Sequence, residues 1–272
     1  MEGRMRVFKF WRIAETTVLI NDTVKSISCF GGSNHSESDA LNDGHRRLEA
    51  VKRRIAGIEK TKGLDYEADI REELIQWIGN LDVVTRNRYG AEVLNSTSCT
   101  FVDIDEPVFR IWQFFRPIRS REQKRKAILA FLGRRLKKPD LNGFGIRVYE
   151  THSGIRLILE GKAMDPRSKE SKNLLRSFHA DQLYSTLCRK QNCYRARLTP
   201  KPYRIKMKPI RLSYPYEAID RSRIDEWIRE YDSKSQGFST CRLVQVLGSD
   251  FVSPAVRYHD ERTKAQSGLP LA

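Results

Sequence analysis

Two aspartates at the end of an apolar segment are the residues of this sequence best suited to chemistry. Asp103 and Asp105 follow Phe101 and Val102, and side chains two residues apart on a strand leave the same face. Two carboxylates this close repel each other unless a divalent cation lies between them, and such oxygen ligands suit Mg²⁺ or Mn²⁺. The pair predicts a metal site for phosphoryl transfer, although a solvated turn with a capping aspartate has the same pattern.

A second group of residues suits the binding of anions. Arg195 and Arg197 alternate with apolar residues, so both guanidinium groups share one face of a predicted strand. Phosphates would satisfy two adjacent guanidiniums, and salt bridges to acids on a neighbouring strand would also do so. Tyrosines among cations either stack on exposed bases or belong to the core. The cations and the tyrosine that continue this segment are Lys201, Tyr203, Arg204, Lys206 and Lys208.

Strands and helices must position these residues. Residues 145–150 and 156–159 predict two strands joined by a turn that contains Ser153 and Gly154. Residues 203–212 alternate cationic and apolar side chains as a strand does. Further strands are predicted at residues 5–11, 17–20, 24–30, 83–86, 91–94, 99–105 and 193–199. Helices are predicted, from apolar residues three or four apart, at residues 36–58, 66–78, 121–136, 181–189 and 221–231. Ser36, with Asp39 three residues later, predicts the N-cap of the first of these helices.

Composition narrows the class of protein. The chain has 272 residues, of which 50 are Lys or Arg and 34 are Asp or Glu, so its formal net charge is +16. This excess predicts a nucleic-acid or nucleotide partner, because phosphates attract such a surface. A hydrophobic content of 39% is too high for a disordered chain, and no apolar stretch approaches the roughly 18–20 residues of a membrane span. No Gly-x4-Gly-Lys-Ser/Thr loop is present, which excludes a Walker-type NTPase.

The cysteines and the two ends of the chain add further expectations. Five scattered cysteines and no apolar segment typical of a signal peptide predict a cytoplasmic protein without a disulfide framework and without membrane contact. Cys188 and Cys193 have a spacing that zinc sites use, and buried thiols explain both residues equally well. Residues after Lys264 are expected to form a frayed tail. His259 and Asp260 are residue types that bind metals, but a single dipeptide favours a cap or a solvent-exposed position. Nothing in the sequence identifies a protein partner.

The order of the motifs resembles that of the archaeo-eukaryotic primase superfamily. An Asp-hydrophobic-Asp strand ending in Asp103 and Asp105 is followed by a helix and then by the Ser153-Gly154 turn, which leads into an apolar strand. The similarity extends over about residues 96–200. It implies that the two aspartates and a third acid, for which Asp181 is the best candidate, bind catalytic Mg²⁺ or Mn²⁺.

The same resemblance implies substrate contacts. The residues that would hold a nucleoside triphosphate are Ser153, Gly154, Arg156, Arg195 and Arg197. Those that would hold nucleic acid are Lys201, Arg204, Lys206 and Lys208. The family has a histidine on the strand after the turn, where this chain has Arg156. The expected function is therefore a primase-polymerase-like nucleotidyltransferase acting on a DNA or RNA template. The alternatives are a catalytically inactive nucleic-acid-binding or nucleotide-binding protein on the same fold, and a metal-dependent nuclease.

The expected fold is α+β, with an antiparallel-rich sheet, flanking basic helices and a primase-like (RRM-like) catalytic core. Residues 1–95 are expected to form an N-terminal α/β lobe. Residues 96–272 are expected to form the primase-like core with a C-terminal helical or extended extension.

Overall fold

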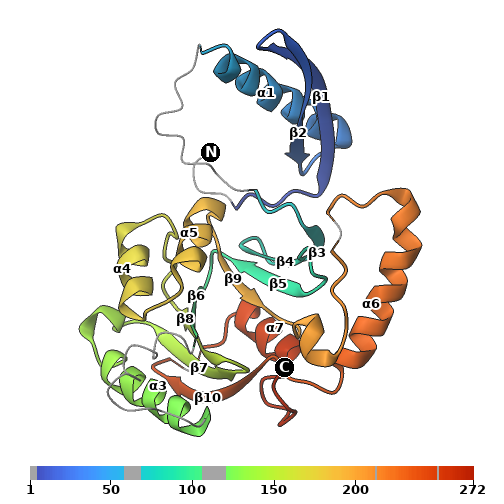
Figure 1. Cartoon of the computed structure of the whole chain (residues 1–272). Helices are drawn as coiled ribbons and strands as arrows, with labels where there is room; N and C mark the ends of the chain where they lie inside the picture. The colour runs from blue at the N-terminus through green and yellow to red at the C-terminus, as the bar shows by residue number, and fades with distance from the viewer. Residues whose placement is uncertain (1–4, 58–68, 106–120, 212, 250) are drawn as a thin grey trace.

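The structure, a computed structural model of the whole chain, describes residues 5–57, 69–105, 121–211, 213–249 and 251–272. Figure 1 shows the first two strands and the first helix grouped apart from a larger part, which contains two four-stranded sheets. Within the described residues, the strands of all three sheets pair in antiparallel fashion. The expected α+β class with antiparallel sheets is confirmed.

The N-terminal module is a β-hairpin with one helix packed on it. Asn21 and Asp22 both have positive φ, as a tight two-residue hairpin turn requires. The helix begins after Ser36, whose hydroxyl accepts a hydrogen bond from the Asp39 N–H, so the predicted cap is confirmed. The module consists of β1 (Phe10–Ile20), β2 (Thr23–Ser33) and α1 (Glu37–Ile55).

The first large sheet draws strands from two distant parts of the chain. Its order is β3 (Glu73–Ile78), β4 (Asp82–Arg86), β5 (Glu92–Ser96) and β9 (Tyr194–Arg197). The helix expected over residues 66–78 is wrong for residues 73–78, because a bulge between Leu74 and Gln76 breaks the alternation of a strand. The lobe boundary expected after residue 95 falls inside β5, which pairs with β9.

The second large sheet carries the first predicted aspartate. Its order is β10 (Cys241–Leu247), β7 (Gly145–Thr151), β8 (Gly154–Glu160) and β6 (Thr100–Asp105). The predicted hairpin between β7 and β8 is confirmed. In the register of β6 and β8, Asp103 lies opposite Arg156 and Asp105 lies opposite Gly154. The sequence did not predict β10.

Of the five remaining α-helices in the described residues, Figure 1 shows four around the two sheets and the last one in the chain, α7 (Pro254–Thr263), between them. The other four are α3 (Arg121–Arg135), α4 (Lys169–Ser177), α5 (Gln182–Gln191) and α6 (Arg221–Ser235). α7 connects the sheets, because Arg262 donates to both carboxylate oxygens of Glu92 on β5 while His259 packs against Tyr149 on β7. The predictions of α3, α5 and α6 are confirmed, whereas α4 and α7 were not predicted.

Two predicted segments have a different structure. The frayed tail is wrong: Ala265 and Ala272 are buried, and the Ala272 N–H donates to the Ser239 carbonyl. The strand expected over residues 203–212 is also wrong, because the segment begins with a short 3₁₀ helix, η3 (Pro202–Ile205). The predicted alternation of burial nevertheless holds in part of this segment. Ile205 and Met207 are buried, and Lys206 and Lys208 are exposed.

One apolar cluster fills the space between the two large sheets. It includes Leu94 of the first sheet, Leu157 of the second sheet and Val256 of α7. A smaller cluster beneath η3 contains Ile205, Met207 and Tyr231. Among the described residues, no helix combines the length and the apolar character needed to cross a membrane.

Candidate anion-binding site

The first predicted aspartate is paired with an arginine. The Arg156 Nε and Nη2 atoms donate to the two carboxylate oxygens of Asp103 at 2.7 and 3.0 Å. Arg156 is almost fully buried, whereas about a third of the Asp103 side chain (35%) is exposed. Burial alone would raise the pKa of Asp103, but the charge and hydrogen bonds of Arg156 outweigh it and lower this pKa. Asp103 is therefore ionised at neutral pH, with both oxygens engaged.

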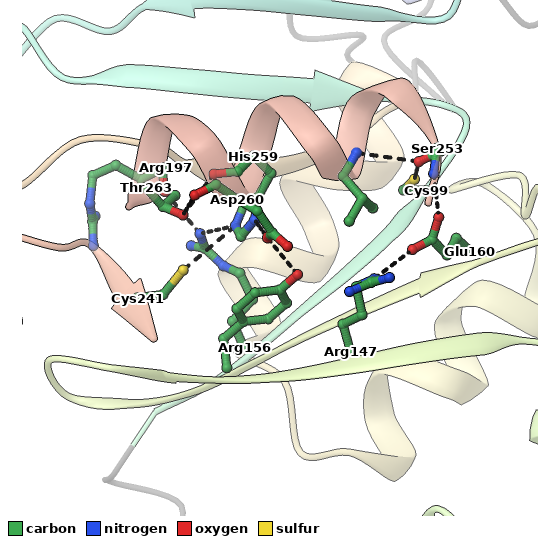
Figure 2. Close-up of polar contacts among 12 residues, drawn as sticks. Cys99, Arg147, Arg156, Glu160, Arg197, Cys241, Ser253, His259, Asp260 and Thr263 are labelled. Carbon is green, nitrogen blue, oxygen red and sulfur yellow. Dashed lines mark hydrogen bonds and ion pairs between the residues drawn. The ribbon is translucent and has the colours of Figure 1, made fainter. Parts of the chain in front are cut away.

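The third nitrogen of Arg156 is engaged as well. Its Nη1 atom donates to the Arg197 carbonyl at 2.8 Å and lies 3.4 Å from His259 Nε2 (Figure 2). His259 Nδ1 lies 2.9 Å from Asp260 Oδ1, which also accepts a hydrogen bond from the Tyr149 hydroxyl. Burial is the main cause of the lowered pKa of His259. The imidazole is therefore neutral, with its proton on Nδ1, because a carboxylate accepts and a guanidinium donates.

The sequence did not identify His259 as part of this cluster. It predicted that His259 and Asp260 cap an element or face solvent, whereas His259 is fully buried. A signal was available in the helical spacing of α7, where the buried residues all lie on one face. These residues are Ala255, Val256, His259 and Thr263.

Arg197 contrasts with Arg156 because its guanidinium lacks a counter-charge in contact. Its side chain forms no hydrogen bond or ion pair within the described residues, and its buried Nε atom is unsatisfied there. Burial lowers the pKa of Arg197 to about 10, and the charges of Arg156 and Arg204 act in the same direction. Figure 2 shows the Arg197 side chain directed away from the His259–Asp260 pair.

Arg204 extends this positive region toward the turn between β7 and β8. Its Nη2 atom donates to the Ser153 hydroxyl at 2.9 Å, and its buried Nε atom has no partner in the described part of the chain. Arg204 lowers the pKa of Arg197, so the two cations are close enough to interact. We call Ser153, Arg197 and Arg204 the arginine site.

The positive region reaches the surface beside η3. Burial would raise the pKa of the Tyr203 phenol, but the charges of Lys201, Arg204 and Arg197 outweigh it and lower this pKa. Lys206 and Lys208 lie on the exposed side of the same segment. These two lysines, both predicted to bind nucleic acid, therefore lie on the segment that continues from Arg204, next to the arginine site.

Other predicted site residues have different surroundings. Arg195 donates to both carboxylate oxygens of Glu72 at 2.7 and 2.6 Å, which is the salt bridge that the sequence left open. Asp181 is exposed and caps α5, where its carboxylate accepts the Leu183 N–H. Gly154 faces Asp105 in the backbone register. The Asp105 side chain lies outside the described part of the structure.

The described residues do not assemble a metal centre. No group of three or more His, Cys, Asp or Glu side chains in this part of the chain could hold a metal ion. Both Asp103 oxygens accept from Arg156, and Asp181 acts as a helix cap. Cys188 and Cys193 are buried thiols, and burial raises the pKa of Cys188 to about 12, which disfavours the thiolate that zinc requires. Asp103 and Asp181, the expected metal ligands whose side chains the structure describes, are therefore engaged in other contacts.

Comparison with known proteins gives no match to a protein-family model, a curated protein or a solved structure. The function is therefore inferred from the arginine site and its surroundings. Two neighbouring guanidiniums, one of them oriented by its hydrogen bond to the Ser153 hydroxyl, form a set of donors with net positive charge. Such a set can bind phosphate oxygens in several directions.

Proposed function

We propose that this chain binds the phosphate groups of nucleic acid at the arginine site. The observation that carries the proposal is the unbalanced charge of Arg197. The charge of Asp103 raises the pKa of Arg197, but burial and the charges of Arg156 and Arg204 outweigh it, and both Asp103 oxygens accept hydrogen bonds from Arg156. A partly buried cation without a counter-ion in contact is costly. A bound phosphate would supply the missing negative charge.

A polyanion fits this surface better than an isolated phosphate does. Exposed Lys206 and Lys208 continue the positive charge beyond Arg204, and the chain carries a net charge of +16. Each lysine near a backbone phosphate releases counter-ions and adds to affinity without reading sequence. These features support salt-dependent binding with little base specificity.

Fluorescence anisotropy with labelled oligonucleotides at several salt concentrations tests the proposal. Wild type should bind with an affinity that falls as salt rises. Arg204→Ala should weaken binding about tenfold at low salt, since it removes a charge-assisted contact. It should also flatten the salt dependence by about 0.7 per lost phosphate contact on a single strand.

Arg134→Ala is the matched control, because Arg134 is an exposed arginine on α3 and its loss changes the net charge equally. This variant should retain the wild-type affinity within about twofold, as expected for a remote exposed charge. Equal losses in Arg134→Ala and Arg204→Ala would contradict a localised site and would assign the binding to overall charge.

A second candidate function is primase-polymerase-like nucleotidyl transfer with Mg²⁺ or Mn²⁺. It is favoured by one observation: Asp103, Arg156 and Arg197 come from three distant segments and lie together, as the resemblance implies. The arrangement of Asp103 and Asp181 described above does not supply the metal ligands that this activity needs.

A primer-template assay with Mg²⁺ or Mn²⁺ separates the alternatives. Lengthened products that disappear in Asp103→Asn would support nucleotidyl transfer, and shortened products would support a nuclease. Unchanged oligonucleotides, together with salt-dependent binding, are the result expected for a binding protein. RNA and DNA templates should be compared, because phosphate contacts alone do not distinguish them.

A further inference from the structure

An aromatic side chain is presented to solvent beside the arginine site. Tyr203 is 64% exposed, whereas large aromatic residues are usually mostly buried. The Lys201 Nζ atom lies 6.0 Å and the Arg204 Cζ atom 5.8 Å from the centre of its ring. Two cations therefore lie over the ring at about 6 Å from its centre, and one of them belongs to the arginine site.

The segment that carries Tyr203 is held in place from beneath. Pro202 is buried, and Ile205 and Met207 belong to the apolar cluster under η3. The Met207 N–H donates to the Pro202 carbonyl at 2.9 Å, which closes the turn. The chain is therefore anchored before and after Tyr203, and the exposed ring projects from an ordered segment.

A buried tyrosine fixes the chain that leads into this turn. The Tyr231 hydroxyl donates to the Pro200 carbonyl and lies 2.8 Å from Thr199 Oγ1. Trp227 stacks on Tyr231, with ring centroids 4.8 Å apart. The connection from β9 to η3 is therefore ordered by packing, so that Arg197 and Tyr203 are positioned by the same scaffold.

We propose that Tyr203 stacks on a base of single-stranded nucleic acid whose backbone phosphate is bound at the arginine site. This inference rests on the proposed function and adds the class of nucleic acid. An aromatic ring beside cations provides a stacking surface and a phosphate contact together, and every base has a face that can stack. In a duplex the base faces are already stacked on each other, so Tyr203 favours the single strand.

The test compares Tyr203→Ala with Tyr203→Phe, using four labelled probes of equal length. The probes are single-stranded DNA, single-stranded RNA, duplex DNA and an abasic deoxyribose-phosphate strand. Tyr203→Ala should weaken binding to the base-containing single strands about tenfold, within the range for loss of one base–aromatic contact. It should leave duplex and abasic binding within about twofold, and Tyr203→Phe should keep wild-type affinity, since the ring remains.

Phe251→Ala is the matched control. Phe251 is 60% exposed and lies beyond the Leu247 end of β10, whereas the Ser153 turn lies at the opposite end, next to Cys241. This variant should bind all four probes as wild type does.

The outcomes separate the two proposals. If wild type binds none of the probes, including the abasic strand, the proposed phosphate binding fails, and base stacking fails with it. If wild type binds but Tyr203→Ala has the same affinity for every probe, only base stacking fails. A loss that is equal for abasic and base-containing strands would also overturn stacking, because it would show that Tyr203 supports the phosphate contact alone. A difference between the DNA and RNA arms would identify which strand the site prefers.

Discussion

The two ends of β9 carry the same residue type on the same face of one strand, yet their surroundings differ. At one end, Arg195 donates to both oxygens of Glu72 and also to the Gln191 side chain. Burial alone would lower the pKa of Arg195, but the charge of Glu72 outweighs it and raises this pKa. At the other end, burial lowers the pKa of Arg197 to about 10, and its Nε atom is unsatisfied within the described residues.

This difference separates an arginine that stabilises the fold from the arginine to which we assign phosphate binding. The Nη2 atom of Arg195 donates to both oxygens of Glu72, so this arginine has its counter-charge within the chain. Arg197 instead increases the free energy of the folded state, because the environment disfavours its charged form. A binding site that lowers stability without its ligand is a common cost of function. The contrast leads to five predictions.

The largest expected effect is at the paired end. Arg195→Met should lower the free energy of unfolding by about 3 kcal/mol, because it leaves Glu72 partly buried without its cation. Urea unfolding at neutral pH measures this loss. Oligonucleotide binding should remain at wild-type strength at temperatures where the variant is folded. A stable variant that no longer binds would show that Arg195 contacts the ligand.

Arg197→Met should have the opposite effect on stability. We expect the free energy of unfolding to rise by about 1–2 kcal/mol, a discounted value because the side chain is partly solvated. Oligonucleotide binding should fall about tenfold, as expected for loss of a charge-assisted contact. Urea unfolding and anisotropy measure the two effects. Lower stability in Arg197→Met would contradict the unbalanced charge and would assign Arg197 a structural role.

The same variant makes a prediction about pH. The pKa of Arg197 is about 10 in the folded protein, and the ordinary value for arginine is 12.5, so the unfolded chain retains the proton to a higher pH. Stability therefore rises with pH where the unfolded state binds more protons. The advantage of Arg197→Met should shrink as pH rises above about 10, which urea unfolding at alkaline pH measures. A constant difference up to pH 12 would contradict the lowered pKa.

A smaller effect is expected at the neighbouring Asp103–Arg156 pair. The pKa of Asp103 is lowered from 3.8, so its stabilising contribution is present above pH 3.8 and is lost as pH falls through the lower, folded-state value. Asp103→Asn should cost about 1–2 kcal/mol at neutral pH, because one third of the carboxylate side chain is exposed and the asparagine oxygen still accepts from Arg156. It should also flatten the pH dependence of urea unfolding below pH 3.8. An unchanged acid profile would contradict the pairing.

The smallest expected effect concerns the turn that orients Arg204. Ser153→Ala removes the hydroxyl that accepts from Arg204 at 2.9 Å. Binding of single-stranded oligonucleotides should weaken about threefold, since one hydrogen bond contributes about 0.5–1.5 kcal/mol. Thermal stability should change by less than about 2 °C, because the turn is partly exposed. A tenfold loss would instead make Ser153 a direct ligand contact.

Local patterns predicted many elements, while distant contacts decided the rest. The cap at Ser36, the hairpin of β7 and β8, and helix α3 follow from neighbouring residues, and these predictions are confirmed. The bulge in β3 depends on pairing with β4. It interrupts the alternation of a strand, so the spacing of the apolar residues predicted a helix instead. The C-terminal tail is ordered by contacts with Ser239 that no local pattern encodes.

The candidate site was predictable to a similar extent. Residue type and alternation indicated the shared face of Arg195 and Arg197, and nearby cations indicated the positive surface. The partner of Arg195 is Glu72, 123 residues earlier in the chain, so the sequence could not show which arginine is neutralised. His259 and Arg156 are 103 residues apart, so the sequence could not show this contact either. The sequence alone thus predicted a cationic face but not the difference between its two ends.

The most direct test of the account measures thermal unfolding of wild type and Arg197→Met, with and without a single-stranded oligonucleotide at low salt. Without ligand, Arg197→Met should unfold at the higher temperature. The oligonucleotide should raise the midpoint of wild type, since a ligand that binds only the folded state stabilises it. It should raise the midpoint of Arg197→Met much less. Equal shifts in both proteins, together with a lower midpoint for Arg197→Met without ligand, would contradict the account.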